Sequence, residues 1–463
     1  MCIKGLLFLG LILLCRVSIA QRLELLGQLN PFDSVQLNKN TPILPRLNTD
    51  QKFDSQRIIP IIDLGLRYNP SISGKGGAGL LWDLQHNKWF TRIGGAIGVN
   101  TVLPAGFISN GIHLNSINNL AFNVRPIVRL GITPTPYVSA QIGFDQNFYG
   151  EGYRSLFLSD VGSPYPFTSL RFNLGPVTYQ AMGMYLNTVG TQKKYGINHY
   201  LNLKLGKNLR LALFEAVIFN SGDTLSNRSF EPAYLNPFMI IRSVGSGDNV
   251  LMGGEFSIYA NKSTWYGQVI IDDILMSALL NREKYWGNKL GVQVGWKYLT
   301  QKGNHKLHMR TELNVVRPYT YSHIGTYSHI GNQLSYTYNN YVLAHPKGAN
   351  FWEIFTRVDY ITKHWAGMAE LAIGQKGLNA PYGGDVFAPY TLRPLDYGVL
   401  LLQGNKTNQF HIRIQGSRIL KHWYNAQLFI ELLGSYYSDS SSNRFNCSPI
   451  IGLRSAIWND YRF

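Results

Sequence analysis

The sequence predicts an all-β protein: a transmembrane antiparallel β-barrel of about 18 strands, plugged by loops and short helices. Two observations support this prediction: a secretory signal opens the chain, and its last segment alternates in character up to an aromatic residue. Side chains alternate between the two faces of a strand, so one parity of a barrel strand meets lipid and the other meets the lumen. We therefore expect the closing strand of a bacterial outer-membrane barrel from the apolar residues of one parity, Ile451, Leu453, Ile457, Tyr461 and Phe463.

The N-terminus has the features of an export signal. Lys4 precedes an apolar run over residues 5–14, and small residues stand at the usual cleavage positions up to Ala20. We expect cleavage after Ala20, so that residues 1–20 form the signal peptide. Lipidation at Cys15 is an alternative, although the residue before it is not the small one that lipoproteins carry. Cleavage leaves Cys447 as the single cysteine, which excludes an internal disulfide.

Composition and charge agree with a barrel. No later apolar stretch approaches the roughly 18 to 20 residues of a membrane helix. Charged residues make up only 15%, while 46 Gly, 28 Tyr and 23 Phe suit tight turns and interfacial girdles. The formal charge of +17 favours lipopolysaccharide or acidic polysaccharide as partners. Alternatively, the cationic side chains line a solvated lumen and rim. Nucleic acid is not expected, because no zinc, helix-turn-helix or aromatic RNA-binding signature is present.

Strand-like runs fill most of the chain. Residues 21–56 are polar with little periodicity, which predicts a periplasmic leader or small plug, followed by the barrel over residues 57–463. Roughly 24 residues per strand with its loops allows about 16 to 18 strands, and even numbers are the rule in bacterial single-chain barrels. Besides the closing strand, the predicted strands are Ile58–Tyr68, Ala78–Leu84, Phe90–Val99, Leu120–Leu130, Tyr137–Phe144, Val177–Leu186, Ile197–Leu205, Leu209–Phe219, Val250–Tyr259, Trp265–Ile271, Leu290–Leu299, Lys306–Val316, Trp352–Ile361, Ala366–Ile373, Tyr397–Leu402, Phe410–Arg418 and Ala426–Tyr436.

Short turns and long connections are expected at opposite ends. Four tryptophans each follow a short Lys-containing turn, which is typical of a periplasmic rim with its girdle: Trp89, Trp265, Trp365 and Trp423. Tight turns at residues 206–208 and 303–304 contain glycine, which tolerates positive φ. Long connections in a compact barrel are usually functional, and six are predicted, over residues 100–119, 145–165, 220–249, 272–288, 317–350 and 375–394.

The connection over residues 145–165 combines glycines with a charged, aromatic core. Gly150 and Gly152 predict a tight turn that folds Arg154 inward, where its guanidinium could bind a carboxylate or sugar hydroxyls. The structural alternative pairs Arg154 with an acid of the same segment, Asp160 or Glu151.

Two further connections contain prolines or acids. Pro237 predicts a rigid turn, and a short helix up to Arg242 could lie inside the barrel, with Asp248 as a turn residue before the next strand. Asp272 and Asp273 point to opposite faces of a strand, which weakens a glycosidase prediction because two facing carboxyls are needed. A cap for a helix over residues 275–280 is the simpler interpretation.

The connection over residues 317–350 is rich in aromatic and cationic side chains. Tyr319, Tyr321 and His323 suit carbohydrate, because sugar C–H faces stack on rings and sugar edges take hydrogen bonds. His323 could instead join His329 and His345 at a metal ion, but no Cys or acid stands at ligand spacing. Ser322 and His323 form no catalytic pair, because sequence neighbours seldom present hydroxyl and imidazole to each other.

At these loops the chain resembles the Wzi-type capsule-assembly family and, more closely, the RemB-like gliding-motility outer-membrane proteins. The resemblance implies an 18-stranded plugged barrel without enzymatic turnover. Such a barrel would anchor or organise exported polysaccharide, or assist surface motility. Its partners would include motility or export machinery. It spans roughly residues 140–355 and is carried by residues 150–160, 231–237, 247–253, 266–273, 316–323 and 345–350.

Three functional hypotheses follow. The leading one is a barrel that binds surface polysaccharide or lipopolysaccharide through its loops, without a cofactor or metal, with Arg154, Arg242, Tyr319, Tyr321 and His323 as candidate contacts. The second is a solute channel, which requires a continuous polar lumen. The third is an enzyme acting on lipid or glycan, which requires a Ser, a His and an acid that converge on one face.

Overall fold

Long antiparallel strands make up most of the computed structural model. It describes residues 55–69, 71–86, 88–101, 112–113, 120–189, 192–221, 231–236, 248–323, 334–420, 423 and 426–454. The predicted signal peptide and the residues after Arg454, including Phe463, lie outside these ranges. The first described strand begins at Ser55, two residues inside the predicted leader.

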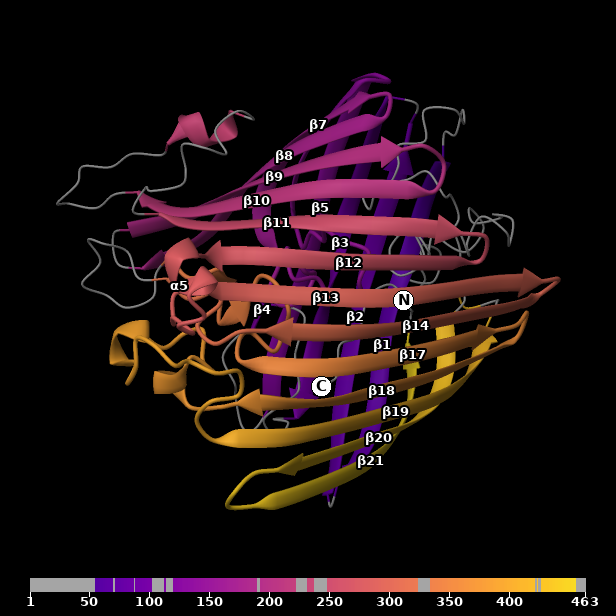
Figure 1. The fold of residues 1–463 in the computed structure, drawn as a ribbon. Coiled ribbons are helices and arrows are strands. Elements are labelled where there is room, and N and C mark those ends of the chain that lie inside the picture. The colour runs from indigo at the N-terminus through magenta and orange to yellow at the C-terminus, as the bar shows by residue number, and fades with distance from the viewer. Residues whose placement is uncertain are drawn as a thin grey trace.

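Eighteen of the described strands close into one ring (Figure 1). Each pairs antiparallel with its neighbours, and the first pairs with the last, where Asp63 lies opposite Arg454. The ring consists of β1 (Ser55–Asn69), β2 (Ser71–Gln85), β3 (Trp89–Thr101), β5 (Leu120–Thr135), β6 (Val138–Asp145), β7 (Tyr165–Leu174), β8 (Val177–Val189), β9 (Gln192–Leu205), β10 (Leu209–Ser221), β11 (Asn249–Ala260), β12 (Ser263–Asp273), β13 (Lys289–Lys302), β14 (His305–Val316), β17 (Phe351–Ile361), β18 (Trp365–Gly377), β19 (Lys406–Leu420), β20 (Ala426–Ser438) and β21 (Asn443–Arg454).

Small elements lie in the long connections. β4 (Ile112–His113) adds to β5, and β15 (Thr337–Tyr338) forms a hairpin with β16 (Tyr341–Val342). The helices are η1 (Pro232–Leu235), α5 (Met276–Leu280), η2 (Ala380–Tyr382) and η3 (Tyr390–Leu392). Among the described residues, no helix is long and apolar enough to cross a membrane.

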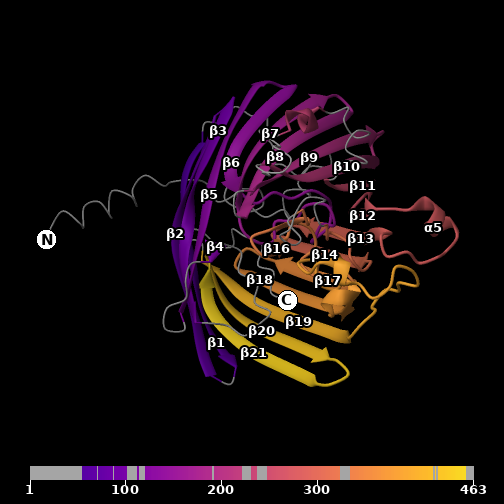
Figure 2. The same cartoon turned by 90° about the vertical axis from the view of Figure 1, so that its left-hand side faces the viewer.

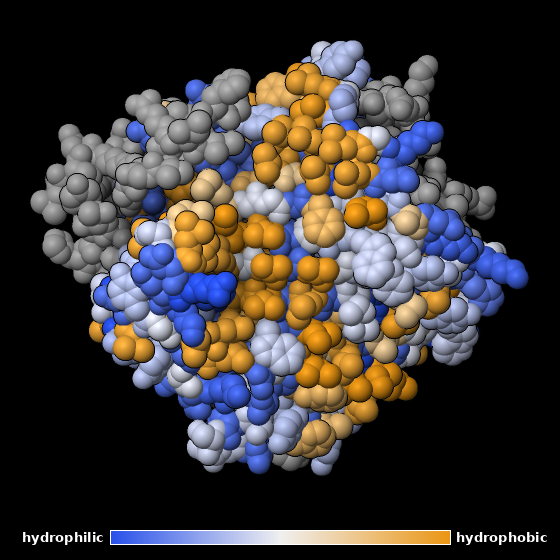
Figure 3. Space-filling model, viewed as in Figure 1, coloured by the Kyte–Doolittle hydropathy of each residue, from blue (hydrophilic) through white to orange (hydrophobic). Residues whose placement is uncertain are grey.

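The strands alternate between an apolar outer face and a polar inner face. On β13, Val292 and Val294 are exposed, whereas Gln293 and Lys297 are buried on the lumen side. In Figure 3 apolar residues form a band across the wall between more hydrophilic margins. A closed, even-numbered barrel with an apolar outer belt satisfies its backbone hydrogen bonds between strands and its outer side chains in lipid. The protein is therefore a bacterial outer-membrane β-barrel.

The two ends of the barrel differ in their connections. The connections after β2, β5, β7, β9, β11, β13, β17 and β19 are two to five residues long, and several are visible at the right-hand end of Figure 1. Gly206 and Gly303 have φ values of 70° and 58°, as tight turns require. The four tryptophans predicted to form a girdle are exposed at this end. Short turns are periplasmic in outer-membrane barrels, so we infer that the long-loop end faces the cell exterior.

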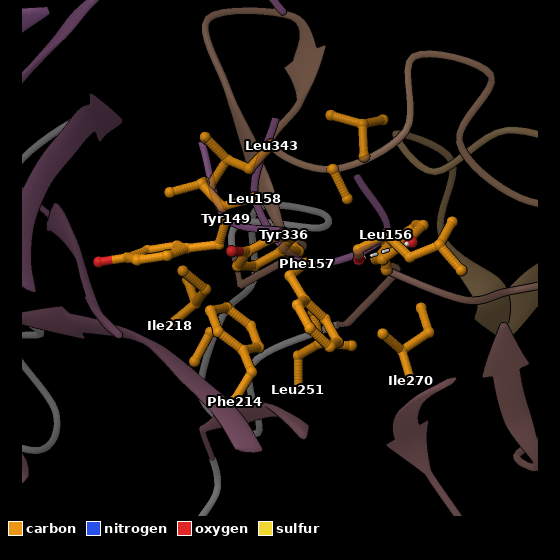
Figure 4. Close-up of a cluster of buried hydrophobic side chains, with 14 of the residues drawn as sticks. Tyr149, Leu156, Phe157, Leu158, Phe214, Ile218, Leu251, Ile270, Tyr336 and Leu343 are labelled. Carbon is orange, nitrogen blue, oxygen red and sulfur yellow. Dashed lines mark hydrogen bonds between the residues drawn. The ribbon is translucent and has the colours of Figure 1, made fainter. Parts of the chain in front are cut away.

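A long connection fills part of the lumen. Residues 146–164, named here the inner plug, link β6 to β7 and lie almost entirely buried. Figure 2, which looks into the barrel from the long-loop end, shows loops inside the ring of strands. Phe157 of the inner plug stacks on Phe214 of β10 with ring centroids 4.7 Å apart, and Leu251 and Ile270 complete the contact from β11 and β12 (Figure 4).

One predicted strand is absent and one observed strand was not predicted, so the predicted total of about 18 strands is unaffected. Residues 397–402, predicted as a strand, belong to the connection between β18 and β19, where Gly398 has φ 76° and Leu402 has φ 64°. β7 was not predicted: its first residue falls in the connection predicted over residues 145–165, and no strand was assigned to the residues that follow. The other predicted strands that lie in described ranges coincide with strands of the ring.

Candidate functional site

The inner plug begins with a turn that requires glycine. Gly150 has φ +120°, and a Cβ there would overlap the Gln268 side chain. At Gly152 a Cβ would press on the carbonyl oxygen of Arg154 and on Gln293. Both glycines therefore lie where the inner plug bends and where a larger side chain would not fit.

Arg154 is buried and ion-paired. Its Nη1 lies 2.5 Å from Glu353 Oε1 on β17, and its guanidinium lies 5.2 Å from the ring centroid of Phe355. Ion pairing agrees with the structural alternative, but this acid comes from a distant strand. Glu151, one of the two suggested partners, binds Lys297 instead, with 2.5 Å between Nζ and Oε2.

The Glu151 carboxylate joins the inner plug to three strands. It pairs with Lys297 of β13 and with Arg210 of β10 at 2.7 Å, and accepts a hydrogen bond from Tyr259 Oη of β11 at 3.0 Å. Burial raises the pKa of Glu151, but the two cations outweigh burial and hold the pKa at about 2. This carboxylate is therefore charged at neutral pH. It anchors the inner plug to the wall through ion pairs and does not act as a proton donor.

A second buried group, named here the Glu353 cluster, consists of Arg154, His345, Lys347 and Glu353. Lys347 Nζ lies 2.7 Å from Glu353 Oε2 and donates a 2.9 Å hydrogen bond to Gln409 Oε1 on β19. His345 Nε2 lies 3.4 Å from Glu353 Oε1, and burial lowers the pKa of His345 to about 4. The cluster fastens both the inner plug and the 334–350 segment to the wall.

The tyrosines predicted to contact sugar are inside the loops. Tyr319 and Tyr321 have φ values of 65° and 71°, which is rare for non-glycine residues, and both are at most 2% exposed. Tyr319 Oη donates to Pro381 O at 2.7 Å, and Tyr321 Oη donates to Leu156 O of the inner plug at 3.0 Å. His323 is half-buried, and its backbone N–H donates to Ser335 Oγ. The candidate contacts therefore hold loops together, and the two tyrosine rings are not presented to solvent.

The predicted helix cap was wrong. Asp272 is buried and its Oδ2 accepts a 2.7 Å hydrogen bond from Tyr321 N, whereas Asp273 is exposed, 3.9 Å from Lys289 Nζ. Leu275 occupies the N-cap of α5, without a capping side chain.

Asp248 and Asp160, the other two predicted acids, both lie in described parts of the chain. Asp248 precedes β11, where its Oδ2 accepts a 2.6 Å hydrogen bond from Tyr234 Oη, and Asp160 is half-buried in the inner plug. Pro237 and Arg242 lie outside the described residues. Within the described ranges, no group of three or more His, Cys, Asp or Glu side chains could hold a metal ion.

Aromatic residues gather at the long-loop end from two other connections. We name this group the aromatic surface; it consists of Tyr285 and Trp286 before β13 and Tyr390, Arg393 and Tyr397 before β19. Ring centroids are 4.8 Å apart for Trp286 and Tyr390, and 5.4 Å apart for Tyr285 and Tyr397. Arg393 Cζ lies 4.1 Å from the Trp286 ring centroid. Tyr397 is 52% exposed, so the group offers a ring face beside a guanidinium to solvent.

The aromatic surface is held in place by the backbone. Trp286 N donates to Asp396 O at 2.9 Å, and Val399 N donates to Lys284 O at 2.9 Å. Arg393 Nε also binds Asp396 Oδ1 at 2.6 Å. The sequence predicted long connections over residues 272–288 and 375–394 but placed Tyr397 in a strand. It did not predict that these residues form one surface, because the pairing joins positions more than a hundred residues apart and no local pattern marks it.

Comparisons with known proteins agree on the fold. No protein-family model and no curated protein matches the chain. Among solved structures it is similar to Wzi of Escherichia coli, described as an outer membrane protein involved in group 1 capsule assembly and as a carbohydrate-binding β-barrel. The TM-score is 0.58 at 14% identity, over 87% of this chain and 85% of Wzi. Identity this low shows a shared fold, and the 18-stranded barrel predicted from the sequence is confirmed.

Weaker similarities extend to other outer-membrane barrels. OccK5 of Pseudomonas aeruginosa has a TM-score of 0.45 at 10% identity, over 87% of this chain and 97% of its own. OprD of the same organism has a TM-score of 0.45 at 8% identity, over 87% and 96%.

Proposed function

We propose that this protein is a non-enzymatic outer-membrane barrel that binds surface polysaccharide at its aromatic surface. The observation that carries the proposal is the half-exposed pair of Tyr285 and Tyr397 beside Arg393 at the long-loop end. Sugar C–H faces stack on such rings, and a guanidinium binds carboxylate or hydroxyl groups of an acidic glycan. The fold shared with the carbohydrate-binding Wzi barrel supports the same class of ligand.

The biological setting of this binding is part of the proposal. The settings that we propose are capsule or exopolysaccharide assembly, in line with the described involvement of Wzi in capsule assembly, or an accessory role in gliding motility. Lipopolysaccharide and motility or export machinery are the partners that these roles imply. In either role the buried candidates Arg154, Tyr319 and Tyr321 contribute by fixing the loops, while His323 and Arg242 stay as predicted contacts.

The proposal is tested with the purified full-length protein and a labelled anionic bacterial polysaccharide. Tyr285→Ala/Tyr397→Ala is expected to weaken retention by about thirtyfold, since stacking is worth about 1 kcal/mol per ring. The matched control is Tyr137→Ala/Tyr360→Ala, which removes two exposed tyrosines from the short-turn end. Equal retention by both double variants and the unaltered protein would refute binding at the aromatic surface.

A solute channel is the second candidate function. It is favoured by arginines at one level of the inner wall, Arg310 on β14, Arg357 on β17 and Arg413 on β19. Their charges are met by acids, since Arg357 Nη1 lies 2.6 Å from Glu370 Oε1 and Arg413 pairs with Glu431 at 2.8 Å. Single-channel conductance in a planar bilayer separates the candidates: steady large openings favour the channel, and a silent barrel that retains polysaccharide favours the binding protein.

A further inference from the structure

The short helix α5 presents an apolar face away from the barrel. Met276 and Leu280 are 55% and 74% exposed, and Leu275 and Leu279 are also exposed, while Ala278 on the opposite face is buried. Figure 2 shows α5 standing out from the wall, on the side away from the lumen. These leucines therefore pack neither in the core nor in the lumen.

The apolar face of α5 continues the lipid-facing belt. α5 lies between β12 and β13, whose outward residues Val269, Val292 and Val294 are exposed. A helix that follows such a strand at the long-loop end meets the outer margin of the hydrocarbon layer. Apolar helices at that depth lie in the interface with their leucines in the acyl region.

Two exposed cations follow α5 directly. Arg282 and Lys284 have φ values of 57° and 55°, which non-glycine residues adopt rarely. Gly398 N donates to Glu283 O and Val399 N donates to Lys284 O, so this backbone is fixed. The Glu283 carboxylate accepts a hydrogen bond from Asn281 Nδ2 at 3.1 Å. Among the described residues, the side chains of Arg282 and Lys284 have no hydrogen-bond or ion-pair partner.

We propose that α5 with Arg282 and Lys284 is a docking site for the phosphorylated glycolipid of the outer leaflet, lipopolysaccharide. Its acyl chains would contact the α5 leucines, and its lipid A phosphates would bind the two cations. Exposed apolar groups beside unpartnered cations at the edge of the belt match a ligand that carries acyl chains and phosphate together. A polysaccharide has no acyl chains to cover the leucines. This site concerns lipid and is independent of glycan binding at the aromatic surface.

The probe is deep-rough lipopolysaccharide, which lacks the long polysaccharide, and the same material after removal of its lipid A phosphates. Binding to the full-length protein in detergent micelles is measured for Arg282→Gln/Lys284→Gln. We expect about thirtyfold weaker binding of the phosphorylated form, since each of the two cations near an anionic surface contributes about 1 kcal/mol. Lys88→Gln/Lys363→Gln at the short-turn end is the charge-matched control.

A second pair of variants tests the apolar contact. Leu279→Ser/Leu280→Ser is expected to weaken binding of both forms, whereas Leu392→Ser/Leu395→Ser, in the connection before β19, is not. Unchanged affinity in the Arg282→Gln/Lys284→Gln variant, or an equal loss for the dephosphorylated form, would overturn the proposal. Competition by inorganic phosphate at the concentration of lipopolysaccharide would show a free-anion site and would also overturn it. Polysaccharide retention is expected to be unchanged in these variants, so failure here leaves the proposed function intact.

Discussion

The Glu353 cluster and the aromatic surface contain the same kinds of residue in opposite environments. In the Glu353 cluster, Arg154 lies against the Phe355 ring and against an acid, all of them buried. In the aromatic surface, Arg393 lies against Trp286 and pairs with Asp396, which is exposed. Removing an arginine from a buried pair strands a charge in a low dielectric, whereas water replaces the partner at a surface. Residue type alone therefore does not distinguish a structural ion pair from a binding site.

The largest difference is expected on removing one acid from each region. Glu353→Ala leaves Arg154, Lys347 and His345 facing one another, and should lower the free energy of unfolding by about 3–5 kcal/mol. Asp396→Ala, which breaks an exposed pair, should change it by less than about 1 kcal/mol. Denaturant unfolding in micelles, followed by tryptophan fluorescence, measures both. Equal losses would contradict the distinction between the two regions.

The next effect is a dependence of stability on pH that comes from the Glu353 cluster. Burial lowers the pKa of His345 to about 4, so between about pH 6.5 and 4 the unfolded chain binds a proton that the folded protein does not. Stability is therefore full above pH 6.5 and falls as the pH drops toward 4, by up to about 3 kcal/mol. His345→Gln should make this slope smaller by the contribution of His345. His364→Gln, at the short-turn end, should keep it.

The smallest effect on stability, with the clearest effect on binding, is expected at Arg393. Arg393→Gln should change the free energy of unfolding by less than about 1 kcal/mol and weaken retention of acidic polysaccharide about threefold. Arg154→Gln should do the reverse: it destabilises the barrel, and the protein that stays folded retains polysaccharide normally. A retention loss at Arg154 without loss of stability would assign sugar contact to the inner plug.

Strand alternation and turn chemistry were sufficient to predict the barrel from the sequence. The lipid and the lumen impose a period of two on nearly every strand, and that signal is local. It fails where a local pattern has another cause. Val399 is apolar because it packs with Trp286 and Tyr319. Residues 397–402 therefore have the apolar pattern of a strand without forming one. β7 was missed, although its backbone pairs with β6 from Tyr165 to Phe172.

The site was predicted less well, because its geometry depends on distant contacts. The prediction of a turn at Gly150 and Gly152 with Arg154 inside it used local sequence alone. The partner of Arg154 is Glu353, and the burial of Tyr321 depends on Asp272 and Leu156, all far away in sequence. Which tyrosines remain in solvent is decided by which loops cover one another, and a single sequence carries no local sign of that.

The seam between β1 and β21 has a consequence for how the protein is made. Asp63 and Arg454 pair across it although nearly the whole described chain separates them, so this contact is the least local in the wall. Loop-closure entropy makes such pairings slow, and until β21 arrives the edges of β1 and β20 present unpaired backbone groups. The ring therefore cannot close before β21 is in place, and a chain that lacks β21 is expected to remain an open sheet with two unpaired edges.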